Sequence, residues 1–284
     1  MKVAVIGAGG QLGSDLVRVM SDLDCIPLMH NDIEVTDEAS CIAVLTRIRP
    51  DVVINTAAFH QVDACEDDPN RAWTVNALGS RNVVKACEAT GATYVYISTD
   101  FVFDGEKGAP YVEEDVPRPI NTYGVTKLAG EFYARCVPNH YVVRVASLFG
   151  VAGASGKGGN FVETMIRKAR SGERVAVVAD LYMSPTYTRD AAVAIKYIIE
   201  SRLPAGVYHV TGHGTCSWLE FAEEILRQAG FGIHVAPLTA ADLRQKAKRP
   251  RFSALLSSRL PSHVRRPWQE ALGDYLREKG HIGS

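Results

Sequence analysis

The sequence predicts an α/β protein built on a doubly wound parallel sheet, followed by a smaller α/β lobe. Two patterns support this prediction. Short runs rich in β-branched residues alternate with longer runs whose apolar residues recur at helical spacing. The first short run, Lys2–Ile6, is apolar without a break after its lysine, and a helical pattern follows at Gln11–Met20. Alternating units of this kind place helices on both faces of a parallel sheet.

The remaining units of the first half repeat the alternation. Thr36 or Asp37 is the expected cap of the second helix, and Gly91 is expected to end a long later helix. Because ligands bind at the carboxyl ends of parallel strands, we expect functional residues in the loops that follow them. The expected strands are Cys25–Met29, Val52–Asn55, Thr93–Ser98 and Tyr141–Val145, and the expected helices are Asp37–Ile48, Pro69–Thr90 and Tyr123–Arg135.

The pattern becomes less regular after about residue 146. Five glycines fall within residues 150–159, which makes this loop a candidate lid. We expect helices at 158–171, Thr188–Ser201 and Ser217–Ala229, and strands at Val175–Val178 and Val207–Val210. The chain is therefore expected to divide into a dinucleotide-binding domain at 1–149 and a substrate-binding lobe at 150–284. Elements near 187–210 are candidates to rejoin the first sheet.

Composition narrows the class of protein. The chain has 284 residues with 46% hydrophobic composition, enough for a large core, and a net charge of −1, which gives no argument for a nucleic-acid partner. The six cysteines are scattered, as in a cytoplasmic protein with reduced thiols. We find no apolar run long enough to span a membrane and no cluster of metal ligands in the sequence. These observations predict a cytoplasmic protein that acts on a small molecule.

A glycine-rich turn joins the first strand to the first helix. Gly7, Gly10 and Gly13 fit the spacing G-x-x-G-x-x-G directly after a buried strand. Glycine lets the backbone turn tightly and approach a pyrophosphate, whose charge the helix N-terminus stabilises. The turn therefore predicts a dinucleotide site with contacts from Gly7, Gly10, Gln11, Leu12 and Gly13.

The end of the second strand leaves the choice between NADH and NADPH open. An acidic residue there would bind the ribose 2′-hydroxyl of NAD, and an arginine would bind the 2′-phosphate of NADP. The segment Leu28-Met-His-Asn-Asp32 has neither at the strand tip, which slightly favours NADPH or the use of both. Glu34 and Val35 either flank the adenine or belong to an ordinary helix cap.

Three residues form a candidate catalytic group. Thr99 ends a predicted strand, while Tyr123 and Lys127 lie four residues apart, on one face of a predicted helix. A lysine near a phenol favours the phenolate, so we expect Lys127 to lower the pKa of Tyr123. Such a tyrosine can protonate a ketone oxygen while a nicotinamide delivers hydride, and Thr99 can orient that oxygen. The alternative is that Tyr123 only packs and Thr99 only caps a turn.

The combined motifs resemble the extended short-chain dehydrogenases/reductases, and within them the dTDP-4-dehydrorhamnose reductases. The resemblance covers nearly the whole chain. It rests on the glycine turn, Asn55-Thr-Ala-Ala58, Ser98-Thr-Asp-Phe-Val-Phe-Asp-Gly105 and Tyr123-Gly-Val-Thr-Lys-Leu-Ala-Gly-Glu131, and more weakly on Val62-Asp-Ala-Cys-Glu66, Asn76-Ala-Leu-Gly79, Gly159-Asn-Phe161, Ser184-Pro-Thr186 and Arg249-Pro-Arg-Phe-Ser253.

The resemblance implies a Rossmann fold and a reaction. It implies reduction by NADPH or NADH of the 4-keto group of a dTDP-6-deoxy-hexulose, for cell-surface polysaccharide. Thr99, Tyr123 and Lys127 would be catalytic, and Ala57 and Ala58 would join Tyr123 and Lys127 in lining the cofactor. The substrate would contact Val62, Asp100, Asn160 and Arg249. The resemblance also implies a homodimer formed through surface helices.

Two departures from the family pattern leave the exact sugar open. After Arg144 the family usually has Thr-Ser-Trp, whereas this chain has Val145-Ala-Ser147. The Gln-x-Gly that precedes its Pro-Thr pair is Leu181-Tyr-Met183 here. Two other functions stay open beside the reductase. One is another sugar-nucleotide enzyme of this scaffold, such as an epimerase or a related keto-reductase. The other is a non-catalytic dinucleotide-binding regulatory subunit.

Overall fold

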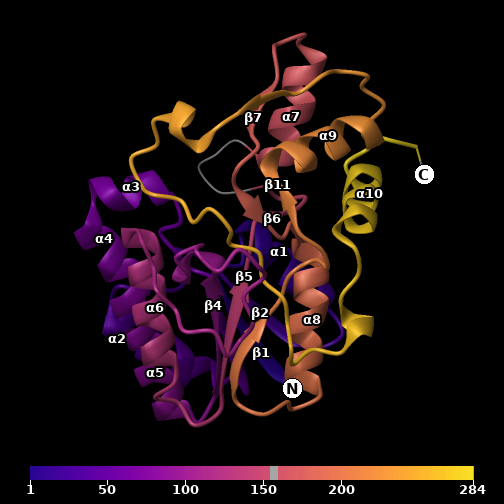
Figure 1. Ribbon diagram of the computed structural model, residues 1–284. Helices are drawn as coiled ribbons and strands as arrows, with labels where there is room; N and C mark the ends of the chain where they lie inside the picture. The colour runs from indigo at the N-terminus through magenta and orange to yellow at the C-terminus, as the bar shows by residue number, and fades with distance from the viewer. Residues whose placement is uncertain (154–158, 284) are drawn as a thin grey trace.

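The centre of the molecule is a six-stranded parallel sheet. The computed structural model describes residues 1–153 and 159–283. The strands lie in the order β10-β5-β4-β3-β1-β2, and every neighbouring pair is parallel. Figure 1 shows this sheet in the lower half of the molecule. The strands are β1 (Lys2–Ile6), β2 (Asp24–Leu28), β3 (Val52–Asn55), β4 (Thr93–Thr99), β5 (His140–Val145) and β10 (Gly206–His209).

Helices cover both faces of this sheet, so the predicted doubly wound fold is confirmed. On one face, α1 (Gln11–Val19) and α8 (Thr188–Glu200) pack side by side over a core that includes Leu16 and Ile195. The other face carries α2 (Glu38–Ile48), α5 (Gly79–Thr90) and α6 (Thr122–Ala134), which Figure 1 shows to the left of the sheet. Local signals set the helix ends: Asp37 caps α2, and α5 ends at Gly91 in the left-handed conformation.

The order of the strands positions the ligand site. The chain runs outward from β1 to β2 and then crosses back to β3 on the other side of β1. Ligands of such sheets bind at the carboxyl ends of the strands where the strand order reverses, which here is between β1 and β3. The glycine turn follows β1 and the segment 56–60 follows β3, so both lie at this position.

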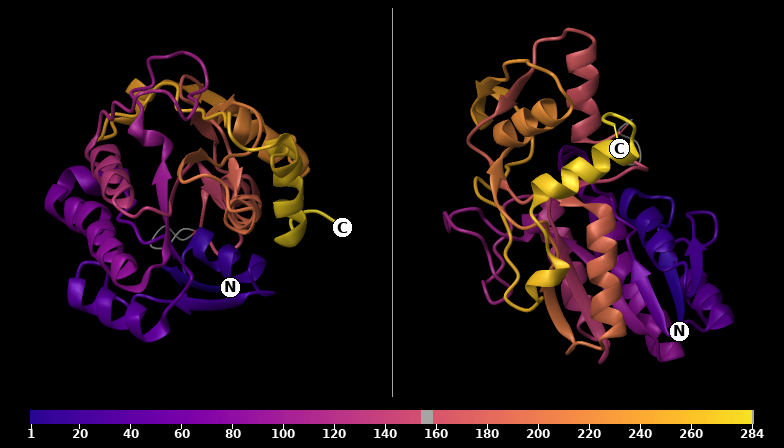
Figure 2. Two further views of the ribbon diagram at one scale, coloured as in Figure 1. Left: turned by 90° about the horizontal axis from the view of Figure 1, so that it is seen from below. Right: turned by 90° about the vertical axis from the view of Figure 1, so that its right-hand side faces the viewer.

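A second part of the chain lies above the carboxyl edge of the sheet (Figure 1). Its own apolar core includes Phe149, Phe221, Leu272 and Tyr275. Figure 2 shows its last helix extending across the molecule, where an ion pair between Glu278 and Arg18 ties it to α1. The elements are α7 (Phe161–Arg170), α9 (Trp218–Gln228) and α10 (Trp268–Glu278), and the short strands β6 (Leu148–Phe149), β7 (Ala176–Val178), β8 (Tyr182–Met183), β9 (Thr186–Tyr187), β11 (Cys216–Ser217) and β12 (Ala236–Leu238).

The structure differs from the sequence prediction in several elements. The single helix expected at Pro69–Thr90 is α4 (Pro69–Trp73), a π-helical segment (Thr74–Leu78) and α5. Helices α3 (Val62–Asp67) and α10 and three short 3₁₀ helices (Asp100–Val102, Ala240–Leu243, Ser262–Val264) are not among the expected elements. Residues 246–260, here called the strap, run in extended form along both parts of the molecule. The candidate lid at residues 150–159 lies partly outside the described residues.

The described residues contain neither a membrane-spanning helix nor a cluster of metal ligands. Within residues 1–153 and 159–283, none of the helices combines the length and hydropathy that crossing a membrane requires. In the same ranges, His, Cys, Asp and Glu side chains do not gather in threes or more at metal-binding distance.

Candidate active site

The glycine turn closes tightly on its own backbone. Gly7 has a φ of +78°, and a Cβ added there would lie 2.6 Å from the Thr56 hydroxyl. A Cβ on Gly13 would lie 2.2 Å from the carbonyl oxygen of Gly7, so a larger residue cannot fit unless the turn moves. Gly10 is the N-cap of α1 and has no side chain with which to cap the N–H groups of the first turn. This close backbone cradle at a helix N-terminus fits a pyrophosphate.

The two residues after the turn contact other parts of the molecule. The amide nitrogen of Gln11 donates to the Leu148 carbonyl at 3.1 Å, and its oxygen accepts from the Gly150 N–H at 3.1 Å. Leu12 is buried in the core beneath α1. Gln11 therefore couples the glycine turn to the loop after β6, and a cofactor contact at Leu12 would use its backbone.

The end of β2 has no carboxylate free at its tip among the described residues. Met29, directly after the strand, is 46% exposed. The Asp32 carboxylate folds back and accepts from the Met29 N–H at 2.8 Å. Glu34 accepts from both the N–H and the hydroxyl of Thr36, each at 2.8 Å, while Val35 is buried. The structure at the end of β2 therefore does not favour binding of NAD over NADP, or of NADP over NAD.

The loop after β3 is held from both sides. The Ala57 N–H donates to the Asn55 side chain at 3.0 Å, and Ala57 and Ala58 are half-buried. Phe59 donates from its N–H to the Asn76 amide oxygen at 2.9 Å and accepts from the amide nitrogen at 3.1 Å. The π-helical segment places Asn76 for this pairing, and such segments often occur at functional sites.

Thr99 lies at the end of β4, where its hydroxyl is fixed by two hydrogen bonds. It donates to Asp100 Oδ1 at 3.0 Å and accepts from the Phe101 N–H at 3.2 Å. The other oxygen of Asp100 accepts from the Ser253 hydroxyl at 2.5 Å. Burial raises the pKa of Asp100 to about 6, although the hydrogen bonds from Ser253 and Thr99 lower it. Both carboxylate oxygens are therefore engaged within the protein.

Tyr123 lies in the first turn of α6, next to Thr99. Its ring meets the Phe101 ring edge-on, with the centroids 6.0 Å apart. Burial raises the pKa of the phenol, and the nearby Thr99 hydroxyl opposes this rise only in part. The prediction that Lys127 would lower this pKa is therefore wrong for this structure, because the pKa is raised, with desolvation as the largest cause and only the Thr99 hydroxyl opposing it. A phenol that stays protonated at neutral pH suits a proton donor.

Lys127 lies one turn further along α6 and is almost completely buried. Its Nζ lies 4.2 Å from the centre of the Tyr96 ring. Burial lowers the pKa of this lysine to about 7, while the negative charge of Glu131 raises it. A lysine in this state can exchange a proton near neutral pH.

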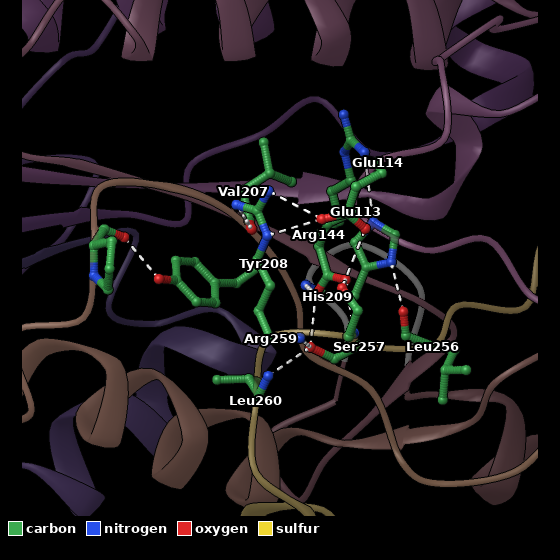
Figure 3. A network of polar contacts seen from close by, with 12 residues as sticks. Glu113, Glu114, Arg144, Val207, Tyr208, His209, Leu256, Ser257, Arg259 and Leu260 are labelled. Carbon is green, nitrogen blue, oxygen red and sulfur yellow. Dashed lines mark hydrogen bonds and ion pairs between the residues drawn. The ribbon is translucent and has the colours of Figure 1, made fainter.

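A buried ion pair lies behind these residues. Glu131, fully buried on α6, accepts from Arg144 of β5 at 2.7 and 2.8 Å and from the Ser98 hydroxyl at 2.6 Å. Figure 3 shows the continuation of this network from Arg144 to His209 and Glu113. The network links strands β4, β5 and β10 directly beneath the candidate site.

The predicted substrate residues Val62 and Arg249 lie near each other at the start of α3. Val62 is the first residue of that helix and is half-buried. The Arg249 guanidinium lies 3.2 Å from the Asp63 carboxylate, and Lys246 pairs with Asp67. The acidic run of α3 therefore meets the basic run of the strap, a pairing that the sequence analysis did not predict.

Asn160 caps α7 and anchors the loop before it. Its side-chain oxygen accepts from the Glu163 N–H at 3.1 Å. Its nitrogen donates to the Gly150 carbonyl at 2.9 Å and to the Tyr275 hydroxyl at 3.0 Å. Its side-chain oxygen and nitrogen are thus both engaged within the protein, at the base of the glycine-rich loop.

The residues that depart from the family pattern occupy different environments. Ser147 follows β5 with a φ of +43°, a conformation that L residues rarely adopt and that is often found at functional sites. Leu181 and Met183 are buried, and Met183 belongs to the core of the second part. Of the three, Ser147 is the one that follows the carboxyl end of a central strand, two residues after Val145, which pairs with Thr99.

Sequence reasoning missed three residues of this site. Ser253 and Glu131 were quoted only as the ends of motifs, and Asn76 only as the start of one. The sequence signal for a role of these three residues was their position in those motifs. The contacts that give them a role come from residues distant in the sequence: Ser253 lies 153 positions from Asp100, and Asn76 bonds Thr126 across 50 positions.

Comparisons with known proteins agree with this geometry. A family model described as RmlD substrate binding domain matches residues 1–280. The chain is 36% identical to the spore coat polysaccharide biosynthesis protein SpsK of Bacillus subtilis (strain 168), over 98% of each chain. It is also 36% identical to the dTDP-4-dehydrorhamnose reductase of Streptomyces griseus, over 94% of this chain and 90% of the other.

A solved structure supports the same relationship. The dTDP-4-dehydrorhamnose reductase of Bacillus anthracis str. Ames, determined in complex with NADP, aligns with a TM-score of 0.90 and 36% identity. The alignment covers 98% of this chain and 100% of that one.

Proposed function

Because the chain belongs to the family of the RmlD substrate binding domain, we propose that it reduces the 4-keto group of dTDP-4-dehydrorhamnose to give dTDP-L-rhamnose, with NADPH or NADH. One observation carries the proposal. The Thr99 hydroxyl and the Tyr123 phenol lie together at the carboxyl edge of the sheet, on the same edge as the glycine turn. Relatives and a solved structure with matching coverage bear the name of this reductase.

The roles of the three central residues follow from their environment. The nicotinamide, when bound, supplies the hydride to the ketone carbon. Tyr123 donates its proton to the ketone oxygen as negative charge develops there, which its raised pKa allows because the phenol stays protonated at neutral pH. Thr99 hydrogen-bonds and orients that oxygen. Lys127, with a pKa of about 7, returns a proton toward the phenol after each turnover.

The nicotinamide dinucleotide would be held by the glycine turn and the loops after β2 and β3. Gly7, Gly10 and Gly13 would cradle the pyrophosphate together with the backbone of Gln11 and Leu12. Glu34 and Val35 would flank the adenine, and Ala57 and Ala58 would line the path toward Tyr123 and Lys127. The end of β2 fits the use of both cofactors, with a slight preference for NADPH.

The sugar nucleotide would lie between the two parts of the molecule. Val62 would contact the sugar nucleotide from the start of α3. Arg249 would leave its ion pair with Asp63 and bind the diphosphate of the substrate instead. Asn160 would act through the loop that it anchors rather than by a direct contact, since its amide is engaged. The engaged carboxylate of Asp100 likewise supports a role through Thr99.

We propose further that the chain works as a cytoplasmic homodimer with two functional parts. The six cysteines are scattered along the sequence without the pattern of a disulfide framework, which suits a reducing compartment. The pairing of β10 with β5 and the packing of α8 on α1 support assigning 187–210 to the dinucleotide-binding domain with 1–149. The dimer rests on the resemblance alone, and sedimentation measurements test it.

The first experiment measures oxidation of NADPH and of NADH with freshly prepared dTDP-4-dehydrorhamnose. We expect turnover by the wild-type chain and a loss of at least about 100-fold in Tyr123→Phe, which keeps the ring but removes the proton donor. Product analysis identifies the sugar. Absence of wild-type turnover, with cofactor still bound, overturns the proposal in favour of a non-catalytic subunit or another sugar. NAD that stays tightly bound through purification favours an epimerase.

A further inference from the structure

We propose that Ser253 of the strap and Asp100 are positioning residues that act on catalysis through Thr99. The inference rests on the proposed reductase function. Neither residue needs to touch the substrate for this role. The contact between them joins the second part of the chain to the end of β4, directly at the candidate catalytic hydroxyl.

The strap is held tightly where it passes the loop after β4. A Cβ added to Gly105 would lie 2.5 Å from the backbone nitrogen of Arg251 and 2.8 Å from Pro250, so only glycine lets the strap pass this close. On the other side, the Tyr182 N–H donates to the Arg251 carbonyl at 2.9 Å, and the Ser253 N–H donates to the Tyr182 carbonyl at 2.8 Å. The position of Ser253 is therefore fixed by backbone contacts.

The loop after β4 therefore also holds the strap in place. Asp100 binds the strap and Gly105 admits it, and both belong to the motif Ser98–Gly105. A motif that only ended a strand would need neither a buried carboxylate nor a glycine facing another backbone. The strap and this motif form one structural unit around Thr99.

Counting protons shows how Ser253 can affect catalysis. A threonine hydroxyl has one proton, and in this structure the Thr99 proton points to Asp100. To stabilise a developing alkoxide, Thr99 must turn that proton to the substrate oxygen. The buried carboxylate then loses a donor, which is costly unless others remain. The Ser253 hydroxyl, 2.5 Å from Asp100 Oδ2, is such a donor. It therefore lowers the free-energy cost of rotating the Thr99 hydroxyl away from Asp100.

The central test compares steady-state kinetics of Ser253→Ala, Ser253→Thr and Ser257→Ala. Ser257 is the matched control, since it is also a buried strap serine but donates to Glu113 instead, at 2.6 Å. We expect Ser253→Ala to lower kcat about 10- to 100-fold, the effect of one hydrogen bond to a charged group, with little change in either KM. Ser253→Thr should retain most of the activity, and Ser257→Ala should match the wild type.

A double-mutant cycle tests whether Ser253 acts through Asp100. In an Asp100→Asn background, Ser253→Ala should lower kcat by no more than about 2-fold, because the carboxylate that it serves is gone. Independent losses that multiply overturn the inference, as do a wild-type kcat in Ser253→Ala or an equal loss in Ser257→Ala. If Ser253→Ala does not fold, Ser253→Cys, with a weak donor of similar shape, replaces it in the same comparison.

A readout without turnover separates this inference from the proposed function. The infrared band of the buried carboxyl, assigned by its loss in Asp100→Asn, reports the protonation of Asp100 directly. The hydrogen bond from Ser253 lowers the pKa of Asp100, so its titration should move to higher pH in Ser253→Ala and stay unchanged in Ser257→Ala. An unchanged titration in Ser253→Ala overturns the contact, whether or not the protein reduces the sugar.

Discussion

Burial sets the protonation of the two ionisable residues at the centre of the candidate site. Tyr123 and Lys127 lie one turn apart on α6, where Lys127 is buried and Tyr123 is half-buried. Desolvation penalises the charged form of each group, so it raises the pKa of the phenol and lowers the pKa of the lysine to about 7. The pair therefore holds a protonated donor beside a base of near-neutral pKa. This is the arrangement that a ketone reductase needs at neutral pH.

The buried lysine predicts a pH dependence of stability. Its pKa falls from 10.5 to about 7 on folding, so between these values the unfolded chain binds more protons than the folded one. The free energy of unfolding therefore rises with pH across this window. We expect the difference in unfolding free energy between wild type and Lys127→Met to change by roughly 1.4 kcal/mol per pH unit, in favour of the wild type. Denaturant titrations from pH 7 to 9.5 measure it.

An exposed lysine serves as the control for this prediction. Lys85, on α5, pairs with Glu38 at the surface. Lys85→Met should give a curve parallel to that of the wild type over the same pH range, since surface ion pairs contribute little. A parallel curve for Lys127→Met would show that the lysine keeps its proton in the folded state.

Among the elements, the junction of β1 and α1 is the one that short-range sequence signals determined most fully. Each glycine of the motif has a local reason: Gly7 for its positive φ, Gly13 for the approach to the Gly7 carbonyl. Such reasons depend on a few neighbouring residues, so the sequence displayed them. The same holds for Asp37 and Gly91 at helix ends.

Two glycines of this junction give a matched pair of variants. In Gly13→Ala the new Cβ would meet the Gly7 carbonyl at 2.2 Å, whereas in Gly9→Ala it would meet only the end of the flexible Met29 side chain, with the sulfur at 3.1 Å. We expect Gly13→Ala to destabilise the fold by about 1–3 kcal/mol and to weaken NADPH binding at least about 10-fold. Gly9→Ala should stay within about 0.5 kcal/mol of the wild type. Thermal unfolding and calorimetric titration measure both, and equal effects of the two changes would contradict the fit to the pyrophosphate.

Elements shaped by distant contacts were predicted less well. The helical periodicity of 69–90 was found, but not the π-helical segment within it. That segment depends on Asn76, which bonds Phe59 after β3 and Thr126 on α6, and whose carbonyl accepts from Tyr96. Helix α10 was missed for a different reason. Its buried residues Trp268, Leu272 and Tyr275 have helical spacing, so the sequence does contain a local signal for this helix.

At the scale of the whole molecule, the strap connects regions that are remote in sequence. It contacts α3 through Arg249, the loop after β4 through Ser253, and the segment before α6 through Ser257 and Glu113. None of these pairings has a local sequence signal, because each joins side chains that are more than 100 positions apart. The fold class, the glycine turn and the placement of the trio Thr99, Tyr123 and Lys127 at the end of β4 and the start of α6 could be predicted from the sequence. The support that the strap gives to that trio could not.

The network beneath the strap predicts that the stability of the whole molecule is sensitive to acid. His209 of β10 donates from Nδ1 to the carbonyls of Tyr111 and Leu256, and its Nε2 faces Arg144 at 3.4 Å (Figure 3). These partners fit a neutral ring with its proton on Nδ1. Burial lowers the pKa of His209 to about 4, although Glu113 raises it. Protonating this ring places a second positive charge beside Arg144, between the sheet and the strap.

Replacing His209 tests this sensitivity. Between its ordinary pKa of 6.5 and about 4, the unfolded chain binds a proton that the folded chain does not, so the unfolding free energy falls as the pH falls through this window. We expect His209→Gln, which keeps a donor and an acceptor, to lose about 3 kcal/mol less than the wild type between pH 7 and pH 4. His213→Gln, at an exposed position four residues away, should lose as much as the wild type. Denaturant titrations at successive pH values measure these losses. If His209→Gln follows the wild-type curve, protonation of His209 does not cause the loss of stability in acid. Another group of the network must then be responsible, and Glu113 is the next residue to replace.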